Sequence, residues 1–244
     1  KSSFANMVQI HSDLNKEAVV DSSSLQWIES PSKGVFRKML ERDGDEIARA
    51  TSIVKYDPNT SFPEHTHYGG EEFIVLEGAF YDQEGIYPQG SYVRHPINSK
   101  HQPWTTEGCI LLVKLCQMSD DKEPGCVINM NDSKLYENAP CEQGTRTALK
   151  LFSNSSTGEI VSVDHYYPGS QHTFTQGSNG EEFYVLEGEI QEQVGHAIPC
   201  TYSAGTWVRH PGSTEGQTVT RTSEKGAKIW RKSGHLGMKY IIHD

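Results

Sequence analysis

The sequence predicts an all-β protein built from two tandem small domains, each folded as a β-barrel or a double-layered sheet. Short runs rich in Val, Ile, Leu and aromatic residues alternate with Gly, Pro, Asp and Asn along the whole chain. A long internal repeat divides the chain in two, and signals for helices are few. The length of 244 residues is enough for two small domains, each with a core of its own.

The repeat is carried by two blocks. Gly70–Gly78 has the sequence GEEFIVLEG and Gly180–Gly188 has GEEFYVLEG, which match at eight of nine positions at an offset of 110. The string VRHP at Val93–Pro96 recurs at Val208–Pro211 at an offset of 115. The second copy therefore carries five extra residues, which we expect in a hairpin around His196–Tyr202. A period of this length is that of a whole domain and is too long for a solenoid repeat.

From this repeat we predict a first domain at residues 1–120 and a second at 125–244, joined by the polar segment Ser119–Gly125. Within each copy, the apolar runs predict short strands, which favours a barrel or a double-sheet sandwich. Phe36–Arg42 fits two turns of helix or a strand equally well, because glycines flank it on both sides. The predicted strands are Ala50–Lys55, Phe73–Leu76, Cys109–Leu115, Glu159–His165 and Phe183–Leu186.

The composition excludes several partners. A net charge of −10 disfavours binding to nucleic acid, because the phosphate backbone would be repelled. We expect no membrane span, because no apolar run approaches the roughly 20 residues that a helix needs. Five cysteines, an odd number with no C-x-x-C pair, suggest reduced thiols and a cytoplasmic location.

A cluster of metal-binding residue types lies in the first copy. His65 and His67 are two residues apart, so on a strand both side chains point the same way. If the chain turns back at Tyr68–Gly70, Glu71 can face the same interior. Imidazoles with one carboxylate suit Zn, Fe, Mn, Ni or Cu. A further ligand must come from elsewhere, and His95 and His101 are the candidates.

The repeat helps to choose between those two histidines. The counterparts of His65 and His67 in the second copy are Thr175 and Gly177, and His101 falls on Gly216 at the offset of 115. His95 falls on His210, which is kept although the site is lost, so we interpret His95 as structural. We predict one divalent metal per chain, bound in the first copy by His65, His67, Glu71 and His101. Glu72, beside Glu71, should face the other way and lie in solvent or behind the ligands.

At these residues the chain resembles the cupin superfamily and, within it, the ChrR-like cupins. His65–Gly78 is similar to that family's first motif, and Pro88–Tyr92 with Asn98–His101 is similar to its second. The resemblance implies two tandem cupin barrels of the double-stranded β-helix or jelly-roll type. It implies a metal inside the first barrel, with zinc expected first and iron, manganese or nickel as alternatives. Cupins generally place the last histidine closer to the Pro-x-Gly turn, which keeps His95 as an alternative ligand.

In ChrR-type anti-sigma factors, a zinc-binding domain with one His and two Cys precedes the cupin half. Residues 1–50 of this chain hold no such cluster, so a sigma-factor partner is not expected by that mode.

Three functions fit the sequence. The first is a metal-binding module that senses stress or a small-molecule ligand, the second a metal-dependent oxygenase of the diketone-cleaving cupin type, and the third a structural zinc site. The sequence shows no clear general base, so catalytic residues are unassigned, and a homodimer is compatible with it. Aromatic residues that could line the mouth of the first barrel are Tyr56, Tyr81, Tyr87, Tyr92 and Trp104.

Overall fold

The computed structural model describes residues 8–119 and 122–238 and confirms the all-β class. These residues form 23 strands and no α-helix. Three short 3-10 helices lie at Ser22–Ser24 (η1), Ser133–Leu135 (η2) and Gly212–Thr214 (η3). No helix in these ranges is therefore long and apolar enough to cross a membrane. Residues 120 and 121 of the expected linker Ser119–Gly125 lie outside the described residues.

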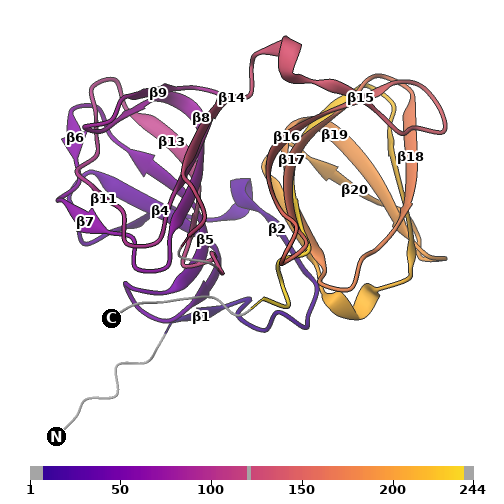
Figure 1. Cartoon of the computed structure of the whole chain (residues 1–244), viewed down its shortest axis with the longest axis horizontal. Helices are drawn as coiled ribbons and strands as arrows, with labels where there is room; N and C mark the ends of the chain where they lie inside the picture. Colours follow the sequence, from indigo (N-terminus) through magenta and orange to yellow (C-terminus); the bar gives the residue numbers. More distant parts are fainter. Residues whose placement is uncertain (1–7, 120–121, 239–244) are drawn as a thin grey trace, which may run out of the picture. The chain divides into compact units, whose positions relative to one another are not determined.

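The chain divides into two compact units, shown in Figure 1. Of the described residues, the first unit holds 8–12 and Leu25–Asn131, and the second holds Asp13–Ser24 and Asp132–Met238. The units are thus not contiguous in sequence. The short segment Asp13–Ser24 belongs to the second unit, whereas the ranges expected from the repeat place it in the first.

In the first unit, the main sheet has the strand order β1-β4-β5-β13-β8-β10-β14. Strands β3, β6, β9 and β12 extend it, and β7 and β11 form a separate pair that carries two of the predicted ligands. The strands are β1 (Gln9–Ile10), β3 (Ile28–Glu29), β4 (Val35–Asp43), β5 (Arg49–Tyr56), β6 (Thr60–Ser61), β7 (His65–Thr66), β8 (Glu71–Tyr81), β9 (Ile86–Pro88), β10 (Ser91–His95), β11 (Lys100–His101), β12 (Trp104–Thr105), β13 (Cys109–Leu115) and β14 (Cys126–Asn129).

The second unit repeats this pattern with the order β15-β16-β17-β23-β19-β21-β2, while β18, β20 and β22 complete it. Its long strand β19 continues three residues beyond the counterpart of β8, which places the expected extra residues in the β19–β20 hairpin. The strands are β2 (Ala18–Asp21), β15 (Glu137–Ala139), β16 (Arg146–Asn154), β17 (Glu159–Tyr166), β18 (Ser170–Thr175), β19 (Glu181–Val194), β20 (Cys200–Ser203), β21 (Thr206–His210), β22 (Thr218–Ser223) and β23 (Ala227–Ser233).

Each unit has its own apolar core, formed by side chains that alternate along the strands toward the interior. Equivalent residues fill equivalent places: Phe73 and Phe183 are each at most 1% exposed. The ambiguous segment Phe36–Arg42 is a strand, within β4. Its pairing with β5 satisfies the backbone of this segment, with one bulge between Met39 and Glu41.

The two repeats exchange their first strand. Strand β14 begins the second repeat but pairs with β10 of the first unit, with Val127 opposite Val93. Strand β2 begins the first repeat but pairs with β21 of the second unit, with Val19 opposite Val208. Val93 and Val208 are repeat counterparts, so β2 and β14 take the same position in the two sheets. Each barrel is thus completed by a strand from the other half of the sequence.

Candidate metal centre

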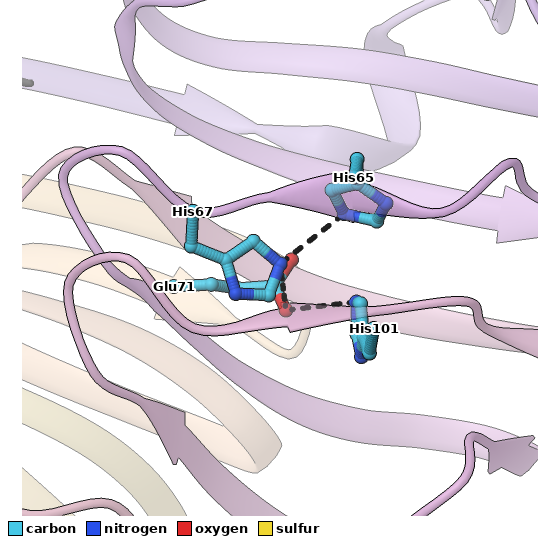
Figure 2. Close-up of side chains that lie close together, drawn as sticks. All are labelled: His65, His67, Glu71 and His101. Atoms are coloured by element: carbon cyan, nitrogen blue, oxygen red, sulfur yellow. Dashed lines mark hydrogen bonds and ion pairs between the residues drawn. The ribbon is translucent and has the colours of Figure 1, made fainter. Parts of the chain in front are cut away.

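The four predicted ligands come from three neighbouring elements of the first unit and point toward one another (Figure 2). Strands β7 and β11 place His65 directly opposite His101. The chain then turns at Gly70, whose amide donates a hydrogen bond to the His67 carbonyl, and β8 begins at Glu71. Gly70 has a φ of +77°, and a Cβ there would lie 2.3 Å from Met118 Sδ, so this turn requires glycine.

The side chains converge on the Glu71 carboxylate. His67 Nε2 lies 3.4 Å and His101 Nε2 lies 3.7 Å from Glu71 Oε2. His65 Nε2 lies 3.2 Å from His67 Nε2. One ligand atom from each of the four side chains falls within 4.8 Å of all the others. His67, Glu71 and His101 are buried and His65 is half-buried, so the cluster is largely sheltered from water.

Hydrogen bonds at Nδ1 hold each of the three imidazoles with Nε2 toward the centre. His65 Nδ1 lies 3.0 Å from the Pro63 carbonyl, which can only accept, so Nδ1 carries the proton. The Ser99 hydroxyl donates to the Pro96 carbonyl and therefore accepts from His67 Nδ1. His101 Nδ1 lies 3.0 Å from Asp82 Oδ2. This leaves the Nε2 lone pairs free, which is the usual arrangement of metal-binding histidines.

The residues present fit a transition metal. His101 Nε2 is buried and has no hydrogen-bond partner among the described residues, a costly state unless another group binds there. Three imidazole nitrogens and one carboxylate oxygen are ligands that zinc, iron, manganese and nickel accept. The cluster His65, His67, Glu71 and His101 can therefore hold such an ion. It would supply a Lewis acid at the floor of the barrel.

Electrostatics keep the cluster ready for a cation. Burial lowers the pKa of His65, and it lowers the pKa of His67 to about 4. Both rings are therefore neutral at neutral pH, as ligation requires. Burial by itself would raise the pKa of Glu71, but His67, His95 and His101 outweigh it and hold that pKa well below its ordinary value. The Glu71 carboxylate is thus anionic.

The alternative ligand, His95, lies behind the cluster. His95 Nδ1 is 3.2 Å from Glu71 Oε2, and the ring stacks on His67 at 5.3 Å. Asp82, His95 and His101 form a second, overlapping group that can hold a metal ion. His95 would join it through Nε2, which lies 3.8 Å from Asp82 Oδ2, while Nδ1 keeps its contact with Glu71. The Nδ1 contact orients the Glu71 carboxylate.

Asp82 was missed in the sequence. It is buried, it accepts a hydrogen bond from His101 Nδ1, and the Tyr87 hydroxyl donates to it at 3.0 Å. A signal was present, because Glu192 lies at the repeat offset of 110 from Asp82. Of the two positions expected for Glu72, in solvent or behind the ligands, the first is wrong. It is buried at 3% exposure and forms an ion pair with the buried Arg94 at 3.1 Å, so it does not lie in solvent.

In the second unit, two arginines pair with the acid that the histidines surround in the first. Glu181, the counterpart of Glu71, is fully buried and paired with both Arg221 and Arg231. Arg221 Nε also lies 2.7 Å from Glu192 Oε2, and His210 Nε2 lies 2.6 Å from Glu192 Oε1. The acids and one histidine are thus kept, while two guanidinium groups neutralise them.

The structural register corrects one correspondence. Thr175, the counterpart of His65, pairs with Thr218, whereas His65 pairs with His101. The counterpart of His101 is therefore Thr218 and not Gly216. The loop between β21 and β22 holds two further extra residues, which raise the offset from 115 to 117. The second unit still lacks all three histidines at the equivalent positions.

A pocket of about 520 Å³ opens onto the cluster in the first unit. Its floor is formed by His65, His67, Glu71 and His101, and Val54, Leu111 and Val113 provide apolar walls. Of the five aromatic residues considered from sequence, Tyr56 alone is among its described lining residues. The volume lies within the range of pockets for small molecules.

Comparisons with solved structures show a shared fold at low sequence identity. Protein YlbA from E. coli is 13% identical with a TM-score of 0.66, covering 94% of this chain and 94% of that one. A mutant of oxalate decarboxylase from Bacillus subtilis is 12% identical with a TM-score of 0.61, covering 92% and 79%. A cupin 2 conserved barrel domain protein from Leptotrichia buccalis is 12% identical with a TM-score of 0.58, covering 93% and 99%. A search of curated proteins found no match.

The family comparison reaches further than the fold. The profile of the ChrR Cupin-like domain matches twice, over residues 15–119 and 126–237. Each match begins just before or at an exchanged strand, β2 or β14, so the repeat unit of the family includes the strand that it gives to the other barrel. The chain therefore belongs to the ChrR Cupin-like domain family, as a duplicated cupin.

Proposed function

We propose that the first barrel binds one divalent transition metal through His65, His67, Glu71 and His101 and uses it to bind a small molecule in a sensing or regulatory role. The observation that carries this proposal is the convergence of three Nε2 atoms on Glu71 at the floor of a pocket. A pocket that ends at the ligands lets a further molecule approach the metal. Zinc is our first choice of metal, because the ChrR-like family motif carries the four ligands.

Metal analysis of protein purified without added metal tests the proposal. We expect one equivalent per chain, because the second unit lacks the three histidines and its Glu181 is already paired with Arg221 and Arg231. Zinc supports the sensing role, whereas iron or manganese favours an enzyme. Two tightly bound equivalents, or none after supply of each metal, would contradict the proposal.

The pH at which the metal leaves is a second measure. A free histidine titrates near pH ~6.5, but burial lowers the pKa of His67 to about 4. Protons therefore compete for this ring only at lower pH, and we expect release below roughly pH 5. Dialysis across a pH series followed by metal analysis gives the midpoint. A midpoint above pH ~6.5 would mean that the buried imidazoles are not the ligands.

A metal-dependent enzyme is the second candidate, favoured by the same pocket. The Bacillus subtilis oxalate decarboxylase that shares the fold is described with Mn(II) centres, which belong to that protein. If this chain is an oxygenase of the diketone-cleaving type, iron-loaded protein should consume oxygen with acetylacetone. The His67→Ala variant should not, since it lacks a ligand. Oxygen uptake by both proteins alike would exclude catalysis at this site.

A purely structural metal is distinguished by stability. Each unit has its own core, and the second is folded without the histidines, so the metal is not required to hold a barrel of this kind. We expect a chelator at neutral pH to lower the melting temperature of the first unit modestly and to leave the second unchanged. Unfolding of both units on metal removal would assign the metal a structural role.

The cellular setting follows from the thiols. All five cysteines are free, and two of them, Cys109 and Cys116, are buried. Free thiols persist in a reducing compartment, so we place the protein in the cytoplasm. A small-molecule ligand is the partner that the pocket supports.

A further inference from the structure

One charged residue faces the interior of the first barrel far along the chain from the metal ligands. Arg37 lies in β4 two residues after Val35, a core residue, and side chains two apart on a strand share a face. Both residues line the pocket that ends at the histidines. The neighbouring Lys38 lies on the other face, with its ammonium 4.7 Å from the Trp27 ring centre.

The guanidinium of Arg37 pairs with an exposed carboxylate, that of Glu46. Its two terminal nitrogens lie 3.3 and 3.2 Å from the two carboxylate oxygens of Glu46, as in a bidentate pair. The Glu46 side chain is 64% exposed, whereas that of Arg37 is 18% exposed. Arg37 Nε is buried without a hydrogen-bond partner in the part of the chain that the structure describes. Since exposed ion pairs contribute little, another carboxylate can displace Glu46.

The pairing with Glu46 indicates that the Arg37 guanidinium can bind a carboxylate. It lies in the hairpin between β4 and β5 and itself lines the pocket. Its carboxylate meets the planar fork of Arg37 in the geometry that suits carboxylates best. Between Arg37 and the metal cluster, the walls are apolar, with Val54, Leu111 and Val113. The pocket therefore offers a cation at one place, an apolar middle and a metal centre at another.

The second barrel supports this interpretation by what it has lost. Arg37 pairs with Val54, and the counterpart of Val54, Asp164, pairs with Ala148, so Ala148 takes the place of Arg37. Val113, opposite Phe73, is replaced by Arg231, opposite Phe183. Arg37 and the wall residues Val54 and Val113 thus have no counterparts of the same kind in the second barrel. Its strand β16 instead carries Arg146 on the same face, where it pairs with Asp164. The lack of counterparts is expected of residues that serve one ligand in the first barrel.

We propose that the ligand of the first barrel is a small organic carboxylate with an aliphatic body, whose carboxylate binds Arg37 in place of Glu46 while its other end faces the metal. The proposal deepens the proposed function and rests on it for the metal alone. The Arg37 contact can be measured without the metal.

Calorimetric titration with hexanoate and with its neutral analogue hexanamide tests the proposal, on both zinc-loaded and metal-free protein. We expect hexanoate to bind and hexanamide to bind at least ~10-fold more weakly, since hydrogen bonds to charged groups are worth about that much. Arg37→Gln should weaken hexanoate binding ~10- to 100-fold. Glu46→Gln should strengthen it by a few-fold, because the internal competitor loses its charge.

Lys38→Gln is the matched control. It removes one positive charge from the residue beside Arg37, on the opposite face of β4. Because a distant charge is screened by salt, we expect the hexanoate affinity to stay within about twofold of that of the parent protein. Loss of a bidentate contact would lower the affinity far more. Melting temperature and metal content establish that each variant is folded. Arg37→Lys, which keeps the charge but not the fork, should restore part of the affinity.

Several outcomes overturn the inference. These are unchanged hexanoate affinity in Arg37→Gln, equal binding of hexanamide, or no hexanoate binding at millimolar concentration. If binding depends on zinc but not on Arg37, the carboxylate goes to the metal, so the inference fails while the proposed function stands. If the protein binds no metal but Arg37→Gln loses hexanoate, the proposed function fails and the carboxylate site stands.

Discussion

The two barrels of this protein keep the same buried acids and neutralise them in different ways. Glu71 and Asp82 in the first unit correspond to Glu181 and Glu192 in the second, and all four are at most 8% exposed. In the second unit, Arg221 lies between Glu181 and Glu192 and binds both. In the first unit, the equivalent space is bordered by imidazoles, two of which are neutral because burial lowers their pKa.

The two centres share one requirement, which is a positive charge beside the buried acids. Buried carboxylates are costly unless a cation compensates them. An internal arginine meets that need permanently, whereas a metal ion, if bound in the first barrel, would meet it reversibly. The second barrel thus carries its own compensating cations, while the first keeps a cluster that could hold a metal ion. The predictions that follow test this contrast, beginning with the largest effect.

The first prediction compares Glu181→Gln with Glu71→Gln in metal-free protein. Removing one partner of a buried ion pair costs about 3–5 kcal/mol, and Glu181 has two arginine partners. Glu71→Gln should cost far less, because its neighbours are imidazoles that can lose their charge. Urea unfolding followed by tryptophan fluorescence suits the second unit, which holds the buried Trp207 and Trp230. Equal losses in both variants would remove the contrast.

The second prediction separates the two overlapping metal groups of the first unit. His65→Ala should weaken metal binding roughly 10²–10³-fold, since each ligand supplies a large share of the total binding free energy. His95→Ala should cost about tenfold, through lost orientation of Glu71. Competition with a chromophoric chelator gives both affinities. If His95→Ala empties the site and His65→Ala does not, the ion is held by Asp82, His95 and His101.

The third prediction tests the exchanged strands. Backbone N–H groups alternate in direction along a strand, so replacing two adjacent residues by proline removes at least one ladder hydrogen bond. Each carbonyl left without its partner costs about 1–3 kcal/mol. The pair Val127→Pro and Ile128→Pro lies in the second repeat but should destabilise the first barrel, through β10. The pair Val19→Pro and Val20→Pro should destabilise the second, through β21. Hydrogen exchange of β10 and β21 reports each effect, and protection lost in the unit of the same repeat would refute the exchange.

The smallest effect concerns pH and the second barrel. Glu17 and Glu192 outweigh burial and raise the pKa of His210 to about 9. A raised pKa gives stability that is fully present below the unfolded value of ~6.5 and is lost as pH rises through about 9, by about 2–3 kcal/mol in all. The second unit should therefore weaken between pH ~6.5 and 9. In His210→Gln this loss should vanish, and an unchanged pH dependence would show that His210 is not its source.

The fold class and the duplication could be predicted from the sequence alone, and so could the four candidate ligands. Strand patterns and turn residues are local, and the GEEF-x-VLEG repeat is visible without coordinates. The pair His65 and His67 shares a strand face because the strand period is two. Their absence from the second copy indicated which half could bind metal.

The strand exchange and the contacts of Asp82, Arg221 and Arg37 depend on which strands pair, so they became visible in the folded structure. The exchange of β2 and β14 could not be foreseen, since either strand fits either edge by pattern. Asp82 reaches His101, and Arg221 reaches Glu181, across 19 and 40 residues of chain. Arg37 reaches the pocket from a segment whose helix or strand character was ambiguous in sequence. Such contacts form only when strands far apart in the sequence pair with each other. That pairing depends on how the whole core packs, which local sequence patterns do not reveal.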